Sequence, residues 1–209
     1  MTGIVHLVGC GPGGIEWVLP RARAVVAGAD VVFGPEDLQA LFPESPAPRI
    51  GLPSRPETAA PLVRASLERG LDCAVLVRGD CGLHSLAKGL QARLPPGSCR
   101  RVPGLSSVQV ACAAFGLDWE RVRILSAHGR ELEALSEADR TAPLLAVLGG
   151  GEGFSTLLDV LRTGLGIRRI HLASDLTLTG ESLRSCDPQE PIPTGLSSRT
   201  VALLETISS

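Results

Sequence analysis

The chain has 209 residues, of which 44% are hydrophobic and only 3% aromatic, with no tyrosine. Its formal net charge is −2 at pH 7, from 20 Lys and Arg against 22 Asp and Glu. It therefore has a core large enough for one or two domains, but neither the basic surface nor the stacking side chains of a general nucleic-acid-binding protein, so no nucleic-acid partner is expected.

The six cysteines form no C-x-x-C pair and no spacing typical of a metal site, and neither do the four histidines. We therefore expect reduced thiols and no protein-bound metal. No apolar run approaches the length of a membrane span, and the first residues lack a signal-peptide pattern. These features predict a cytoplasmic protein with no membrane association.

The first half of the chain alternates short apolar strands with helical patterns. This β-loop-α-β order is typical of a parallel or mixed sheet with helices on its faces, which places the chain in the α/β class. Prolines between residues 34 and 55 predict a loop. The expected strands are Gly3–Val8 and Asp30–Gly34, and the expected helices are Leu19–Ala27, Glu36–Leu41 and Thr58–Arg69.

The central feature is the turn Val77–Ser85, which contains Gly79, Asp80 and Gly82. It follows the apolar run Cys73–Val77, which predicts a fully buried strand, and it precedes helical spacing up to Leu94. Such strand-to-helix turns lie at the carboxyl edge of an open α/β sheet, where ligands bind. The glycines let the backbone approach a ligand, and the Asp80 carboxylate would either cap the helix or face the ligand.

A glycine-rich loop after the first strand also matches the dinucleotide fingerprint, with Gly9, Gly11 and Gly14 in G-x-G-x-x-G register. A nicotinamide site further requires an acidic residue at the end of the second strand. Asp30 stands at the beginning of that strand instead, and Pro12 removes an N–H group that a phosphate cradle would use. A nicotinamide-dependent oxidoreductase is therefore a weakly supported alternative function.

The second half begins near Gly116, which predicts an N-terminal α/β lobe at 1–116 and a C-terminal α/β lobe at 117–209. Two such lobes would enclose a ligand cleft. Before this hinge, Ser106 or Ser107 is suited to cap a helix at Val108–Phe115, and free N–H groups at a helix start favour anionic groups. Further strands are expected at Val122–Ser126, Leu144–Leu148, Arg169–Ala173 and Thr200–Glu205, with short strand or turn pieces near Glu181–Leu183 and a helix at Phe154–Gly164.

Four motifs occur in an order and spacing that resemble the tetrapyrrole (corrin/porphyrin) methyltransferases. The resemblance covers nearly the whole chain and implies the tetrapyrrole methylase fold, with two α/β lobes. One departure is Cys81, where the family often has Pro after Gly-Asp. The motifs are Val8–Gly13, Gly28–Val32, Arg78-Gly79-Asp80 and Pro103–Ser107.

Within that family, the segments Ser106–Gln109, Gly116–Trp119 and Ser126–Arg130 resemble the C5-methylating subgroup, the precorrin-6Y and cobalt-precorrin-7 C5-methyltransferases. The resemblance implies C5 methylation of a precorrin or cobalt-precorrin in cobalamin (vitamin B12) biosynthesis. A chain of 209 residues leaves no room for the second methyltransferase domain of fused enzymes, so a stand-alone C5-methylating domain is expected. Methylation at another ring position by a sister corrin methyltransferase is the alternative within the family.

The resemblance implies S-adenosyl-L-methionine as cofactor and a tetrapyrrole as substrate. It further implies a homodimer and, as a separate partner, a C15-methyltransferase/decarboxylase. His128 is the candidate acid or base, because the ordinary histidine pKa lies near neutrality, and Arg130 would pair with a carboxylate arm of the substrate. The implied cofactor-binding residues are Gly79, Asp80, Cys81, Leu83, His84, Ser85, Ser106, Ser107, Ala127 and Leu148. The implied substrate-binding residues are Gly9, Gly11, Pro12, Gly13, Gly14 and Arg130.

Overall fold

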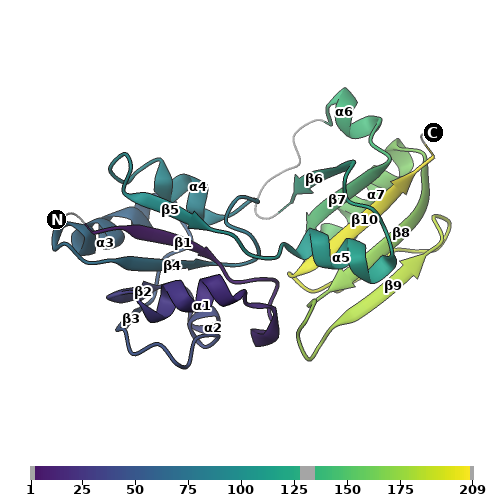
Figure 1. The fold of residues 1–209 in the computed structure, drawn as a ribbon. Helices are drawn as coiled ribbons and strands as arrows, with labels where there is room; N and C mark the ends of the chain where they lie inside the picture. The colour runs from purple at the N-terminus through teal and green to yellow at the C-terminus, as the bar shows by residue number, and fades with distance from the viewer. Residues whose placement is uncertain (1–2, 128–134, 208–209) are drawn as a thin grey trace. The chain divides into compact units, whose positions relative to one another are not determined.

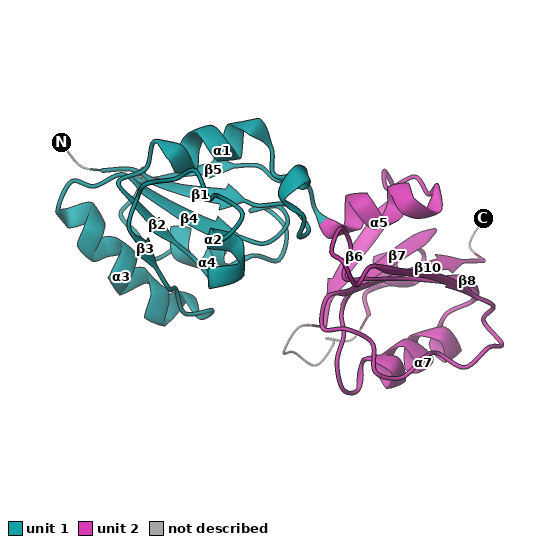
Figure 2. Ribbon diagram, turned by 90° about the horizontal axis from the view of Figure 1, so that it is seen from below, with its two compact units in different colours: residues 1–106 teal, residues 107–209 magenta. Residues whose placement is uncertain are grey.

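The computed structural model of the chain describes residues 3–127 and 135–207, which form two compact units (Figure 2). Unit 1 comprises residues 1–106 and unit 2 residues 107–209. The sequence interpretation placed the boundary ten residues later, after Gly116. Helix α5 (Ser107–Phe115) is grouped with unit 2 because it packs against strand β10 (Thr200–Thr206) of the second sheet.

Unit 1 contains a five-stranded sheet in the order β3-β2-β4-β1-β5, with every neighbouring pair parallel. All five residues of the central strand β4 are buried, as expected for a parallel strand covered on both faces. The predicted parallel or mixed sheet is therefore a parallel one in unit 1. The strands are β1 (Val5–Gly9), β2 (Val31–Phe33), β3 (Arg49–Ile50), β4 (Cys73–Val77) and β5 (Cys99–Val102).

Helices cover both faces of this sheet and make unit 1 a three-layer α/β/α structure (Figure 1). Alternate residues of β4 point to opposite faces, so Val75 packs with α3 and α4 whereas Leu76 packs with α1 and α2. Helix α4 begins at Leu86, where Ser85 caps it by accepting the Ala87 N–H at 3.3 Å, and it ends at Gln91, three residues before the predicted Leu94. The helices are η1 (Ile15–Trp17), α1 (Pro20–Ala27), α2 (Glu36–Gln39), α3 (Pro56–Glu68) and α4 (Leu86–Gln91).

Unit 2 contains a mixed five-stranded sheet in the order β6-β7-β10-β8-β9, in which only β6 and β7 pair in parallel. Helix α7 (Phe154–Gly164) covers one face and α5 the other (Figure 2). The sequence did not predict the single-turn helix α6 (Glu137–Arg140), although Ser136 and Asp139 form a capping box there. The strands preceding β10 are β6 (Val122–Ser126), β7 (Leu144–Gly149), β8 (Ile167–Ser174) and β9 (Ser182–Cys186).

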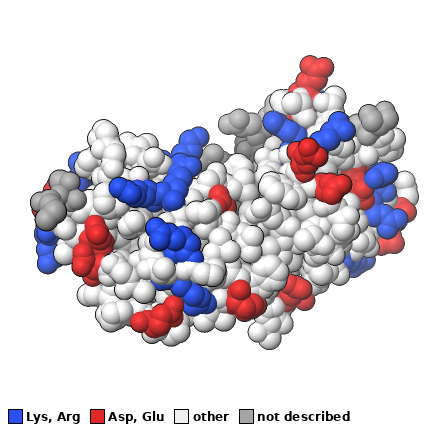
Figure 3. Space-filling model, viewed as in Figure 1, with Lys and Arg blue, Asp and Glu red and all other residues white. Residues whose placement is uncertain are grey.

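Acidic side chains lie among the basic ones in both units on the face drawn in Figure 3. Within residues 3–127 and 135–207, no helix is both long enough and apolar enough to cross a bilayer. The same residues contain no group of three or more His, Cys, Asp or Glu side chains placed to hold a metal ion.

A buried polar group links three strands on the face of the second sheet that carries α5. The ring of His171, 6% exposed, lies 4.6 Å from that of Phe115 and bonds Ser185 Oγ through Nδ1 at 2.8 Å and Glu205 Oε1 through Nε2 at 2.9 Å. Arg168 donates to the other Glu205 oxygen at 2.6 Å. Burial alone would raise the pKa of Glu205, but these two partners outweigh it and hold the pKa below its ordinary value.

We expect Glu205→Gln to be less stable than the parent at pH 7 by about 1.5–3 kcal/mol, the range for hydrogen bonds to a charged group. Because folding lowers the Glu205 pKa, the stabilisation is fully present above the ordinary value of 4.5 and is lost as the pH falls through the lower folded value. Urea unfolding as a function of pH should show the two proteins converging in acid.

The control is Glu190→Gln, which alters an exposed ion pair with Arg184 and should change stability little at any pH. A stability difference between parent and Glu205→Gln that stays constant into acid would contradict the assignment.

Candidate functional site

The predicted ligand-binding turns of unit 1 meet at the carboxyl ends of β4, β1 and β5, which are neighbours in the sheet. The loop after β1 and the turn after β4 are directly hydrogen-bonded. Gly11 N–H donates to the Gly79 carbonyl at 3.2 Å, and Gly79 N–H donates back to the Gly11 carbonyl at 2.8 Å. Gly79 has φ +65°, a left-handed conformation that favours glycine. Two motifs that are far apart in sequence therefore form one hydrogen-bonded pair of loops.

The third turn, which follows β5, contacts this pair of loops through its backbone, at positions occupied by glycine. A Cβ atom on Gly104 would lie 2.4 Å from the Gly79 carbonyl oxygen, and one on Gly9 would lie 2.6 Å from Gly104 N. Both distances are shorter than any normal contact of a Cβ atom. These backbone segments can therefore lie so close together only because glycine has no side chain. The glycines of three separate motifs are thus explained by one crossing of the backbone.

The Asp80 carboxylate fastens two of these turns together. Its Oδ1 accepts the Gly82 N–H at 2.7 Å, within the same turn, and its Oδ2 accepts the Gly104 N–H at 3.0 Å, across to the turn after β5. Asp80 does not cap α4, because Ser85 has that role. The carboxylate therefore holds the backbone of the site in place.

The surface of the β4–α4 turn consists of Gly82, Leu83 and His84. Gly82 and His84 are exposed and Leu83 is half-buried, while the Ser85 hydroxyl donates to the Cys81 carbonyl at 2.8 Å. His84 has φ +41°, which is uncommon for a residue with a side chain. Two of the predicted cofactor-binding residues in unit 1 are buried: Cys81, with 3% of its surface exposed, and Ser106, with 7%.

Gly11, Pro12 and Gly13, predicted to bind substrate, are buried in the structure, and Gly14 is half-buried. The accessible part of this loop is instead η1, where Ile15 is 44% and Trp17 36% exposed. Neither residue was predicted from the sequence, although two large apolar side chains directly after a glycine loop can indicate a binding surface.

Two thiols lie beside the site, and both are buried. Burial raises the pKa of Cys10 to about 12 and also raises the pKa of Cys81 above its ordinary value. The Cys81 sulfur points to the Val102 carbonyl oxygen, at 3.5 Å. Neither thiol is therefore an ionised nucleophile at neutral pH.

Two of the three predicted cofactor residues of unit 2, Ala127 and Leu148, lie at the carboxyl ends of the parallel pair β6–β7. Ala127 N–H donates to the Leu148 carbonyl at 2.7 Å, and Ser107 begins α5. His128 and Arg130, predicted as the acid or base and as a substrate contact, lie outside the described residues. The structure thus brings Ala127 and Leu148 together within this unit.

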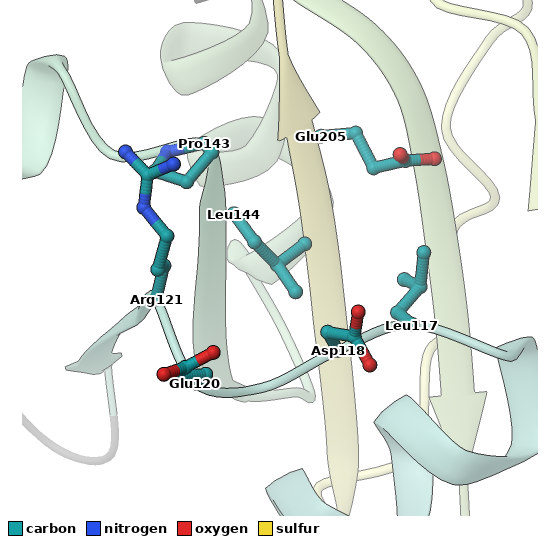
Figure 4. A pocket seen from close by; sticks show the side chains of 7 residues that line it. All are labelled: Leu117, Asp118, Glu120, Arg121, Pro143, Leu144 and Glu205. Atoms are coloured by element: carbon teal, nitrogen blue, oxygen red, sulfur yellow. The ribbon is translucent and has the colours of Figure 1, made fainter.

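Two pockets of about 270 Å³ each lie in the described structure, one in each unit. The pocket of unit 1 borders the β4–α4 turn and includes Arg78, His84 and Ser85. The pocket of unit 2 lies at the amino ends of β6 and β7, the edge of the sheet opposite to Ala127 and Leu148. Figure 4 shows that Asp118, Glu120 and Arg121 of the α5–β6 connection form one side of it. Of these two pockets, that of unit 1 adjoins the predicted site.

The glycine loop departs from a dinucleotide site in its local structure. Gly14 precedes the short helix η1, and α1 begins only at Pro20, so no long helix opens on the loop. Asp30 lies at the start of β2, where its carboxylate accepts the Asp72 N–H at 2.8 Å. The nicotinamide alternative therefore lacks both features that would support it.

Comparison with known proteins agrees with this geometry. The sequence model of the family described as Tetrapyrrole (Corrin/Porphyrin) Methylases matches residues 5–190. The chain belongs to the tetrapyrrole methylases. It is 26% identical, over 182 residues, to the cobalt-precorrin-7 C(5)-methyltransferase of Salmonella typhimurium, an alignment that covers 86% of this chain and 89% of the relative.

Solved structures of tetrapyrrole methylases share the fold. The methyltransferase CobJ superposes with a TM-score of 0.83 at 22% identity, covering 99% of this chain and 95% of the other. The uroporphyrin-III C-methyltransferase of Thermus thermophilus, in complex with S-adenosyl homocysteine, superposes with a TM-score of 0.74 at 22% identity, covering 97% of each chain. The tetrapyrrole methylase fold predicted from sequence is confirmed.

The backbone crossing predicts that Gly104→Ala is strongly destabilising. Its methyl group would meet the Gly79 carbonyl at 2.4 Å, and because the obstacle is backbone, the chain itself must shift. We expect a loss of about 2–3 kcal/mol in the free energy of unfolding, the upper part of the range for overpacking, measured by urea denaturation.

Gly51→Ala is the matched control in the same unit, since nothing lies within 4 Å of a Cβ atom at that position. Equal stability of the two variants would show that the crossing tolerates a side chain, contrary to the close contact described here.

Proposed function

We propose that this tetrapyrrole methylase is an S-adenosyl-L-methionine-dependent methyltransferase that methylates C5 of a precorrin or cobalt-precorrin in cobalamin biosynthesis. Methylation at C5 is supported by the relative named cobalt-precorrin-7 C(5)-methyltransferase, which aligns with this chain along most of both sequences. The related Thermus thermophilus structure with S-adenosyl homocysteine supports the cofactor.

The residues of the site suit a bound sulfonium donor. The β4–α4 turn offers exposed backbone at Gly82, the apolar Leu83 and the imidazole of His84, with Asp80 as the nearby negative charge. We propose that this turn, with Gly79, Cys81, Ser85 and Ser106 in unit 1 and with Ser107, Ala127 and Leu148 in unit 2, makes up the cofactor-binding residues. When bound, the cofactor supplies a methyl group already activated for transfer.

Because the methyl group is already activated, its transfer does not require a strongly catalytic side chain. A site formed mainly by the backbone of glycines is consistent with such a reaction. The acceptor carbon of a reduced tetrapyrrole is electron-rich, so the protein has to orient the reactants and exclude water. The rigid backbone around Gly79 and Gly104 provides the orientation. We propose that Ile15 and Trp17 offer apolar surface to the macrocycle, beside the predicted loop Gly9–Gly14, and that His128 moves the proton and Arg130 binds a carboxylate arm.

The resemblance to the family also leads to three proposals, on the oligomeric state, the location and the partner of the enzyme. We propose a homodimer, a cytoplasmic location and a separate C15-methyltransferase/decarboxylase as a partner in the pathway. Sedimentation analysis of the purified chain tests the first, since a monomer at micromolar concentration would contradict it.

The test of the function is methyl transfer from labelled S-adenosyl-L-methionine to precorrin-6Y and to cobalt-precorrin-7, with the position of the label read by NMR. Label at C5 is the expected result. Label at another carbon would favour a sister corrin methyltransferase. Failure to bind S-adenosyl homocysteine in isothermal titration would contradict the cofactor assignment itself.

Asp80→Asn should weaken binding of S-adenosyl homocysteine about tenfold or more. Asn has one oxygen where Asp has two, so only one of the two N–H groups keeps its acceptor. The other N–H faces an NH2 group, is left unpaired and loosens the turn that the cofactor contacts. Isothermal titration measures the change. Asp30→Asn is the control, because that carboxylate also accepts a backbone N–H but at the opposite edge of the sheet. Equal affinity of both variants would contradict the role of Asp80.

A further inference from the structure

The pocket of unit 1 has the composition of a carboxylate site. It lies at the carboxyl ends of β2 and β4, with Leu38, Leu52 and Leu86 among its apolar lining residues and with Arg78 and His84 as the side chains that can carry positive charge. At about 270 Å³ the pocket is below the usual range of about 300–1,000 Å³ for whole ligands, so it fits one arm of a larger molecule.

Arg78 is a partly exposed arginine that makes an ion pair. Its backbone directly follows the buried strand β4, and its guanidinium bonds Asp37 on α2, 41 residues away in sequence. That bond uses Nη2 alone. Among the described residues, Nε and Nη1 of Arg78 have no hydrogen-bond partner, so part of the guanidinium fork is left for a second carboxylate.

His84 adds a second sign that the pocket is built for a ligand. It adopts φ +41°, a conformation that costs a side-chain-bearing residue of order 1–3 kcal/mol, and it lines the pocket together with Arg78. Strain of this kind persists where the surrounding structure imposes it, and it is concentrated at binding sites.

We propose that this pocket, through Arg78, binds one acetate or propionate arm of the tetrapyrrole substrate. Asp37 is the positioning residue that holds the guanidinium. Arg78 immediately precedes Gly79, so the residue that recognises the arm and the turn that contacts the methyl donor are consecutive in the chain. Binding of the arm thereby sets which ring carbon faces the donor. This inference rests on the proposed function and specifies its substrate contacts.

The test compares Arg78→Ala and Arg78→Lys with Arg93→Ala. Arg93 is a matched control, because it is also a partly exposed arginine of unit 1 paired with one carboxylate, that of Glu57, and it does not line the pocket. Each protein, saturated with S-adenosyl homocysteine, is titrated with uroporphyrin, a stable tetrapyrrole that carries acetate and propionate arms. Separate titrations give its affinity for S-adenosyl homocysteine.

We expect Arg78→Ala to weaken uroporphyrin binding roughly 10- to 100-fold, as for the loss of a charge-assisted hydrogen bond, and Arg78→Lys to weaken it less, since an ammonium keeps the charge but not the fork. Arg93→Ala should bind as the parent does. Affinity for S-adenosyl homocysteine should be the same in all four proteins.

Unchanged uroporphyrin binding by Arg78→Ala would overturn the proposal. So would a parallel loss of both ligands, because it would assign Arg78 a structural part in the turn. A parent protein that binds neither ligand would instead contradict the proposed function, so the two failures are distinguishable.

Discussion

The site depends on three backbone segments that lie closer to one another than a residue with a side chain would allow. Gly9, Gly79 and Gly104 end or follow three neighbouring strands, and at two of them a Cβ atom would overlap the backbone of another. The crossing converts the ends of separate strands into one rigid surface, and the Asp80 carboxylate ties two of its turns together. A group that binds there meets a surface whose shape is set before binding, which is the main requirement of a reaction that depends on orientation.

Much of this could be predicted from the sequence because the relevant signals are local. The apolar runs at β4 and β7 and the periodicity of α7 gave elements close to those in the structure, and the glycine-aspartate turn after β4 was placed correctly between strand and helix. Strand β9 was less evident, because four of its five residues are exposed and it lacks a clear apolar alternation. The boundary of unit 2 was placed late because Gly116 looks like a hinge, whereas the packing of α5 that decides the boundary is not visible locally.

The contacts inside the site could not be predicted in the same way. Asp80 bonds Gly104, which is 24 residues away, and Arg78 bonds Asp37, which is 41 residues away. Both pairs depend on the order of strands in the sheet, which a single sequence does not specify. The burial of Gly11–Gly13 is also a tertiary effect. The same glycine-rich sequence is expected for a loop that contacts a ligand and for one that packs against other parts of the protein.

The protonated thiols beside the site have a chemical consequence for an enzyme that handles a sulfonium compound. A thiolate competes well for an electrophilic methyl group, whereas a neutral thiol does not. Burial raises the pKa of Cys10 to about 12, so its thiol is protonated at neutral pH, and the Cys81 sulfur is turned toward the Val102 carbonyl. At the proposed cofactor site, the fold thereby keeps both thiols protonated beside the methyl donor, and a cysteine can occupy the position after Gly79-Asp80, where the family often has proline, without competing for the methyl group.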